Sequence, residues 1–95
     1  MPFDGVQINE TAARLMEAKE LIRAEGWCPK GEGPVLGPHC VAAAVMRCGF
    51  SRRALEAFVT ANAIETSIGK WNDTPGRTIE EVYAAFDRAI ALMLT

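Results

Sequence analysis

The sequence predicts an all-α fold, a small bundle of about four helices with one long loop rich in glycine and proline. Apolar residues recur at helical spacing in several segments, whereas no run alternates apolar and polar residues as a half-buried strand would. The chain has 95 residues, of which 49% are hydrophobic, an ordinary share for one globular domain. We therefore expect a single helical domain over residues 1–95, with residues 1–8 disordered ahead of the first helix.

The first helix is predicted over about residues 10–25. Asn9 is placed to cap it, because its side chain can accept hydrogen bonds from the free amides of the opening turn. Gly26 has the position of the left-handed residue that ends many helices, and Trp27 can fold back onto the last turn. The apolar stripe of this helix has the spacing i, i+3 and i+7: Leu15, Ala18 and Ile22.

Residues 27–39 are predicted to form a loop, because six glycines and prolines in this segment exclude a helix. Two short helices are expected after it. The first runs from Cys40 to Cys48, is rich in alanine and valine, and ends at Gly49. Ser51 caps the second helix. Its inner face consists of three apolar residues and one terminal amide: Leu55, Phe58, Val59 and Asn62.

The last helix follows a stretch of turn residues over positions 65–77. Thr78 and Glu81 have the spacing of a capping box that opens this helix. Leu92 and Leu94 would point in directions about 200° apart on it, so one core cannot bury both side chains. We therefore expect a homodimer through the C-terminal helix or another partner that covers this end.

Composition and charge argue against several classes of partner. The net charge is −2, with 10 basic and 12 acidic side chains, so no overall field attracts the chain to nucleic acid. No apolar run has the length of a membrane span, and the first residues do not resemble a secretion signal. Three cysteines, an odd number, favour free thiols, although a bridge between Cys28 and Cys40 stays open. We expect a cytoplasmic protein with no cofactor and no membrane contact.

One segment near the end of the chain carries a resemblance. Trp71 to Thr78 reads Trp-Asn-Asp-Thr-Pro-Gly-Arg-Thr, and similar positions continue through residues 80–82 and 86–89. With Trp27-Cys28 and the alanine-rich segment after Cys40, this pattern resembles a family of short, functionally uncharacterised bacterial and phage proteins. The resemblance implies a compact domain that recurs on its own, often near mobile elements. It implies no catalytic residues.

Cys40 and His39 are the residues that suggest an enzyme. Cys40 stands at the start of a predicted helix, where the helix dipole favours a thiolate nucleophile, and His39 would be its base. The alternative is that Cys40 and Cys48 fill the core as small apolar residues. These two cysteines lie about 12 Å apart along a helix, and no paired-ligand spacing occurs, so no metal site is predicted. We expect no enzymatic activity.

Residues 41–62 have several features of a helix-turn-helix motif that binds DNA. They combine two short helices, a glycine in the turn and a basic edge formed by Arg47, Arg52 and Arg53. Against this function, Glu56 and its alanine neighbours offer little to the edges of bases, and the chain is acidic. DNA binding is therefore the alternative hypothesis for the function of the protein. The competing interpretation of residues 41–62 is an ordinary corner between two packed helices, with a purely structural role.

The segment from Trp71 to Thr78 has two interpretations. As an interaction surface, it would present Trp71, Asn72, Asp73 and Arg77, which are residue types that recognise partners. As a structural clasp, it would place Trp71 over the edge of the core and use Asn72 and Asp73 to bond backbone groups. Local turn and cap roles favour the clasp. For the whole chain, the sequence predicts a non-enzymatic module that binds an unknown protein partner.

Overall fold

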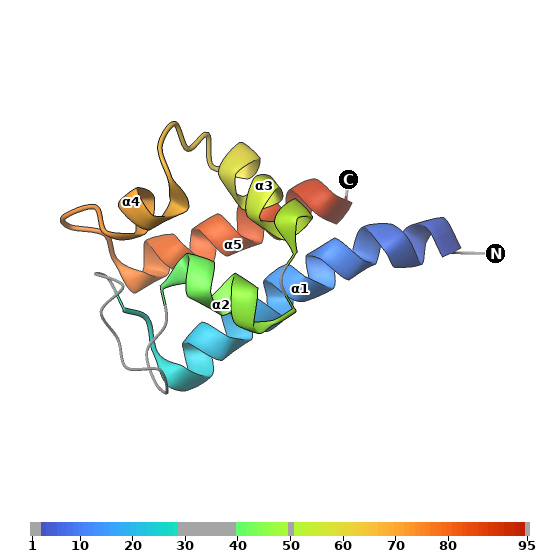
Figure 1. Cartoon of the computed structure of the whole chain (residues 1–95), viewed down its shortest axis with the longest axis horizontal. Coiled ribbons are helices and arrows are strands. Elements are labelled where there is room, and N and C mark those ends of the chain that lie inside the picture. The colour runs from blue at the N-terminus through green and yellow to red at the C-terminus, as the bar shows by residue number, and fades with distance from the viewer. Residues whose placement is uncertain (1–2, 29–39, 50, 95) are drawn as a thin grey trace.

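The computed structural model describes residues 3–28, 40–49 and 51–94, with side chains from Glu10 onward, and these residues form helices and no strand (Figure 1). The predicted all-α fold class is therefore confirmed. The described helices are α1 (Phe3–Glu25), α2 (Val41–Arg47), α3 (Arg52–Ala61), α4 (Ile68–Asn72) and α5 (Ile79–Leu94). None of them combines the length and the apolar character needed to cross a membrane.

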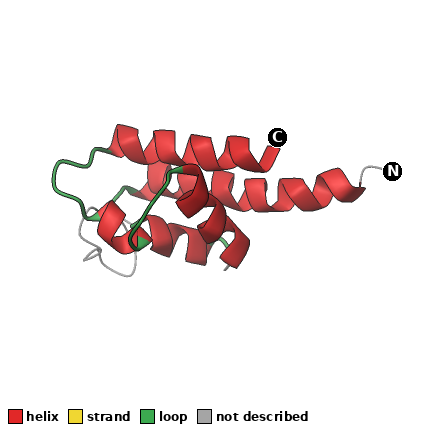
Figure 2. Cartoon of the chain, turned by 90° about the horizontal axis from the view of Figure 1, so that it is seen from above, coloured by secondary structure: helices red, strands yellow, loops and turns green. Residues whose placement is uncertain are grey.

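The two longest helices, α1 and α5, lie side by side and run in opposite directions (Figures 1 and 2). Helix α2 packs on α1, and α3 packs mainly on α5. The short helix α4 contacts α2. This arrangement places the segment between α3 and α5 at one end of the bundle, where it carries the residues of the candidate site.

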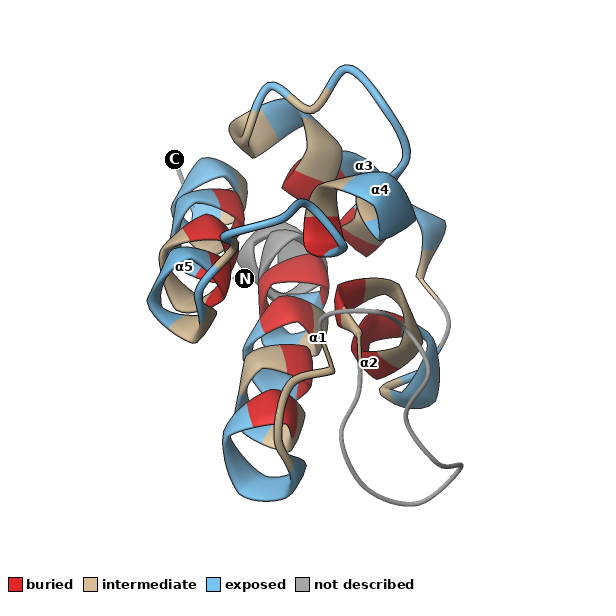
Figure 3. Ribbon diagram, turned by 90° about the vertical axis from the view of Figure 1, so that its left-hand side faces the viewer, coloured by how far each residue is buried: buried red, intermediate tan, exposed pale blue. Residues whose placement is uncertain are grey.

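The core lies between the helices, and the buried positions face inward (Figure 3). The predicted stripe of α1 is fully buried, as are Val82 and Phe86 of α5. Phe58 of α3 meets Phe86 edge to face, with 5.1 Å between the ring centroids. Four helices, α1, α2, α3 and α5, therefore meet in one apolar cluster, which also contains small residues that allow close approach: Ala18, Ala44, Ala54, Ala57, Ala85 and Ala89.

Most predicted helix ends are confirmed by their caps. Gly26 has a φ of +98°, a left-handed conformation in which a side chain would be strained. The Ser51 hydroxyl accepts a hydrogen bond from the amide of Ala54 at 3.1 Å. Thr78 and Glu81 form the capping box, because the Thr78 amide donates to Glu81 Oε1 at 2.9 Å and the Glu81 amide donates to Thr78 Oγ1 at 3.2 Å.

Two helix predictions differ from the structure. Helix α1 begins at Phe3, so residues 3–8 are helical rather than disordered, and Asn9 lies inside the helix instead of capping it. An isolated asparagine favours a helix start only weakly, and a helix that continues through it overrides that preference. Helix α4 was not predicted, because its five residues are too few for a periodic pattern. Of the predicted loop over residues 27–39, residues 29–39 lie outside the described residues.

Candidate functional site

Asn72, the last residue of α4, is fully buried and joins three segments of the chain. Its Oδ1 accepts hydrogen bonds from the indole Nε1 of Trp27 at 2.8 Å and from the amide of Val41 at 3.0 Å. Its Nδ2 donates to the carbonyl of Cys28 at 3.0 Å. The prediction that Asn72 belongs to an interaction surface is therefore wrong, because its side chain is occupied inside the protein.

Trp71 stands next to Asn72 but lies at the edge of the core, half-buried. Its ring meets Phe58 edge to face, with 5.3 Å between the centroids. The guanidinium of Arg77 covers the indole at 4.0 Å from its centroid, and Arg77 Nε donates to the Trp71 carbonyl at 3.0 Å. Glu81 pairs with the same guanidinium at 3.3 Å. Trp71 and Arg77 are thus held in fixed positions by α3 and by the start of α5.

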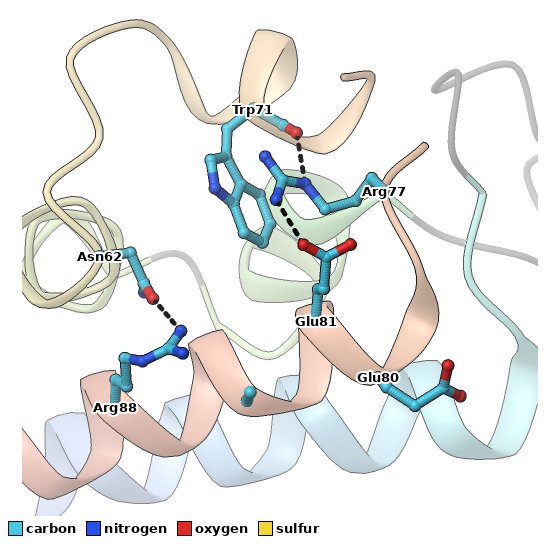
Figure 4. A pocket seen from close by; sticks show the side chains of 7 residues that line it. Asn62, Trp71, Arg77, Glu80, Glu81 and Arg88 are labelled. Atoms are coloured by element: carbon cyan, nitrogen blue, oxygen red, sulfur yellow. Dashed lines mark hydrogen bonds and ion pairs between the residues drawn. The ribbon is translucent and has the colours of Figure 1, made fainter. Parts of the chain in front are cut away.

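A groove of about 300 Å³ opens beside this pair (Figure 4). Helix α5 forms its floor, and its walls are formed by Asn62, the C-cap of α3, by Trp71 of α4 and by Arg77 of the turn before α5 (Figure 4). The small side chain of Ala84 leaves the space between the charged residues of the floor. The described lining consists of Asn62, Trp71, Arg77, Glu80, Glu81, Ala84 and Arg88, and we call it the Trp71 groove.

Asn62 fixes the second arginine of the Trp71 groove. Its Nδ2 donates to the carbonyls of Phe58 and Ala85, both at 3.0 Å, so the amide group has one orientation. The free Oδ1 then accepts a hydrogen bond from Arg88 at 3.1 Å (Figure 4). Arg88 is therefore positioned by an uncharged group, and within the described part of the chain no carboxylate lies within ion-pair distance of it.

The electrostatics of the groove differ between its two ends. The Thr78 amide, followed by the charge of Arg77, holds the pKa of the Glu81 carboxyl below its ordinary value, although burial acts in the opposite direction. Glu81 is thus committed to the cap and to Arg77. The Glu80 side chain points away from Arg88 (Figure 4). Of the two arginines in the groove, Arg88 therefore has the positive charge that is less compensated by a nearby carboxylate.

The remaining predicted interaction residue, Asp73, lies outside the groove. It is exposed, and its Oδ1 accepts a hydrogen bond from Asn72 Nδ2 at 3.0 Å. Of the four predicted surface residues, the structure therefore brings Trp71 and Arg77 together in the groove and places Asn72 and Asp73 elsewhere. The clasp contacts expected of this segment are present in part: Asn72 bonds backbone groups of two other segments, whereas the Asp73 carboxylate accepts from the Asn72 side chain rather than from backbone.

Cys40 and Cys48 lie at the two ends of α2. Cys40 is half-buried and caps α2, with its Sγ accepting a hydrogen bond from the Ala43 amide at 3.4 Å. Cys48 packs against the core, and burial, followed by the charge of Glu17, raises the pKa of its thiol. The predicted base His39 lies outside the described residues. Among the residues described, no three histidine, cysteine or carboxylate side chains gather closely enough to hold a metal ion.

The three arginines of the DNA-binding alternative lie around the α2–α3 corner and are exposed. Arg52 approaches Glu56 one turn later in α3, with 4.0 Å between Nε and Oε1. Their exposed position does not test whether they bind DNA, so DNA binding stays the alternative hypothesis. At the other end of α5, Leu92 and Leu94 are 38% and 53% exposed. The homodimer through this helix stays a prediction.

The chain belongs to the family of unknown function DUF6197. The profile of this family matches residues 7–92, which include α2, α3 and α4, most of α1 and α5, and the whole Trp71 groove. Comparisons with curated proteins and with solved structures each give no match. Membership of DUF6197 therefore agrees with the resemblance to an uncharacterised family and assigns no activity.

The half of the groove formed by Asn62, the C-cap of α3, and by α5 was not predicted from the sequence. Asn62 was placed on an inner helix face, and Ala84 and Arg88 were not singled out. A weak signal was present, because Glu80, Ala84 and Arg88 follow one another at i, i+4 and i+8 on an outer helix face. A small residue between two charged ones leaves a hollow, but only the packing of α3 and α4 against α5 turns this hollow into a groove.

Proposed function

We propose that this DUF6197 protein is a non-enzymatic protein-interaction module and that the Trp71 groove receives a segment of its partner. The observation that carries the proposal is the fixed placement of a tryptophan and two arginines around one open hollow. Tryptophan and arginine are the residue types that contribute most often to binding hot spots between proteins. A groove of about 300 Å³ holds a few side chains of a partner rather than a whole domain.

Pre-organisation supports binding at this position. Arg77 is restrained by the Trp71 ring, the Trp71 carbonyl and Glu81, and Arg88 is restrained by Asn62. Long side chains that are already ordered lose less entropy when a partner binds. The groove therefore presents its polar groups at lower cost than an open surface with mobile arginines would.

Binding without catalysis fits the chemistry of the described lining. It contains an amide, an indole, two guanidiniums, two carboxylates and a methyl group, with no thiol, hydroxyl or imidazole to act as a nucleophile beside a base. One of the carboxylates, Glu81, is already held by the cap of α5. We therefore infer that the groove recognises a partner.

The test fills the groove without changing its charges. Ala84→Leu places a larger side chain on the floor, and Ala91→Leu, at an exposed position of the same helix, is the matched control. We expect the wild type and Ala91→Leu to capture the same protein from lysate of the native host and Ala84→Leu to capture none of it. Circular dichroism verifies that both variants are folded, and titration calorimetry with the purified partner measures the loss. Equal affinity of Ala84→Leu and the wild type would exclude the groove as the binding site.

A further inference from the structure

We infer that the Trp71 groove binds a carboxylate group of its ligand through Arg88, with Arg77 beside it. This inference rests on the proposed function, and it adds the chemical class that the groove recognises. Its basis is the hydrogen-bonding capacity that remains at the two guanidiniums, together with the charge balance between them.

Arg88 supplies the free donors. A guanidinium has five N–H donors in a planar fork, and the described contacts of Arg88 use one nitrogen, Nη1, for Asn62. Because Asn62 is itself held by the carbonyls of Phe58 and Ala85, the Nη1 end of the Arg88 side chain is held in place before a ligand arrives, although the side chain is exposed. Parallel N–H groups at carboxylate spacing allow two hydrogen bonds to the two oxygens of one carboxylate.

Arg77 limits the charge that the groove accepts. Its Nε and Nη1 are engaged by the Trp71 carbonyl and by Glu81, and its side chain is 16% exposed. The lining as a whole has two guanidiniums and two carboxylates, but Glu81 pairs with Arg77 and the Glu80 side chain points away from Arg88, so the uncompensated positive charge lies locally at Arg88 (Figure 4). A carboxylate carries one negative charge and balances Arg88. A phosphate dianion would add a second negative charge near Glu81, which opposes its binding.

The uncharged part of the lining selects the remainder of the ligand. The Trp71 indole and the Ala84 methyl group offer apolar contact between the two arginines. A carbon chain that bears a carboxylate fits this combination, and in a protein partner it has two sources: the terminal carboxylate of the chain, or the side chain of an aspartate or glutamate. Both present the same planar anion to Arg88.

The experiment titrates the isotope-labelled full chain with three short peptides and follows the spectrum by nuclear magnetic resonance. The first probe is acetyl-Gly-Ala-Leu with a free terminal carboxylate, the second is the same peptide as its terminal amide, and the third is acetyl-Gly-Glu-Ala amide. We expect the Nε–H signal of Arg88 and the amide signal of Ala84 to shift with a carboxylate probe and to stay in place with the uncharged amide. The first and third probes distinguish the terminal from the side-chain source.

Variants assign the effect to Arg88. Arg88→Gln lowers the affinity for the better carboxylate probe by about tenfold or more, the usual effect of losing hydrogen bonds between charged groups. Arg88→Lys keeps the charge but not the planar fork and has an intermediate affinity. Arg53→Gln, an exposed arginine of α3, is the matched control and binds as the wild type does.

Three outcomes overturn the inference: no shift with either carboxylate probe at millimolar concentration, an equal response to the amide, or stronger binding of inorganic phosphate at the same ionic strength. Failure here is distinct from failure of the proposed function. If the peptides do not bind but Ala84→Leu still abolishes partner capture, the groove binds a partner by other chemistry. If the peptides bind and Ala84→Leu leaves capture intact, the partner uses another surface.

Discussion

The indole of Trp27 donates a 2.8 Å hydrogen bond to Oδ1 of Asn72, a residue 45 positions further along the chain. The same oxygen accepts from the amide of Val41, so one buried amide group joins the segment after α1, the start of α2 and the end of α4. The position of Trp71 and hence one wall of the groove depend on this junction, because Trp71 precedes Asn72 in the same short helix.

Asn72→Ala should lower the free energy of unfolding by about 3 kcal/mol, because it leaves the buried Val41 amide, the half-buried Trp27 indole N–H and the Cys28 carbonyl without their partner. Trp27→Phe removes one of these hydrogen bonds and should cost less, about 1–2 kcal/mol. Urea unfolding followed by circular dichroism measures both. A loss below about 1 kcal/mol for Asn72→Ala would show that water replaces the amide at this junction.

The partners of Asn72 show why part of the fold could not be predicted from sequence. Caps and turns depend on residues three or four positions apart, and the Ser51 cap, the Gly26 end and the capping box of Thr78 and Glu81 were predicted correctly. Asn72 lies in a stretch with turn composition, which favours a local role. Apart from its neighbour Asp73, its observed side-chain partners are 31 to 45 positions away, and no local pattern encodes such distances.

Trp71→Ala should cost about 2 kcal/mol, less than at a fully buried aromatic position, since Trp71 is half-buried. Arg77→Ala should cost about 1 kcal/mol. In a double-mutant cycle, the sum of the two single-variant losses of stability should exceed the loss of the double variant by about 0.5–1 kcal/mol. The reason is that the stacking of Arg77 on the indole is lost in each single variant and is therefore counted twice in the sum. Additive losses would mean that this stacking contributes nothing to stability.

Cys40→Ser should leave the protein as stable as the wild type or stabilise it by up to about 1 kcal/mol, since serine is a preferred N-cap and the cysteine already accepts the Ala43 amide. Cys40→Ala removes the acceptor and should cost about 1 kcal/mol. Thermal unfolding in the presence of a reductant measures both variants. Destabilisation by Cys40→Ser would instead show that the sulfur matters as an apolar group in the core.

Only the residues of the candidate site that lie in one continuous segment, Trp71 and Arg77, were predicted from the sequence. Trp71 and Arg77 lie within seven positions of each other and share a turn, so their residue types already suggested a surface. Asn62 and Arg88 are 26 positions apart and meet because α3 packs on α5. Composition could not reveal that Asn62 orients Arg88, since this depends on which carbonyls at the end of α3 and in α5 are within reach of its amide.

Glu81 should make stability depend on pH in the acidic range. Its folded pKa lies below the ordinary value, so between the two values the unfolded chain binds more protons, and protonation favours unfolding. The stabilisation is complete at neutral pH and is lost as the pH falls below about 4.3. The melting temperature of the wild type should therefore exceed that of Glu81→Gln at pH 7, with a gap that narrows in acid. A constant gap would exclude the carboxylate as its cause.

The arginines of the α2–α3 corner discriminate protein binding from DNA binding. Changing both Arg52 and Arg53 to glutamate should alter the free energy of unfolding by less than about 1 kcal/mol. Negative charge at the start of α3 is favoured by the helix dipole, whereas the pair of Arg52 with Glu56 is replaced by repulsion, and the two effects oppose each other.

In a gel-shift assay at physiological salt, we expect no retardation of a DNA duplex by the wild type, because its net charge is −2 and Glu56 lies among the exposed arginines of α3. Binding that disappears at modest salt reflects nonspecific attraction to phosphates. Retardation that persists at this salt and is lost in the double variant, with folding intact, would assign the chain to DNA binding. The proposal of a protein partner in the Trp71 groove would then have to be abandoned unless Ala84→Leu also abolished the capture of a protein.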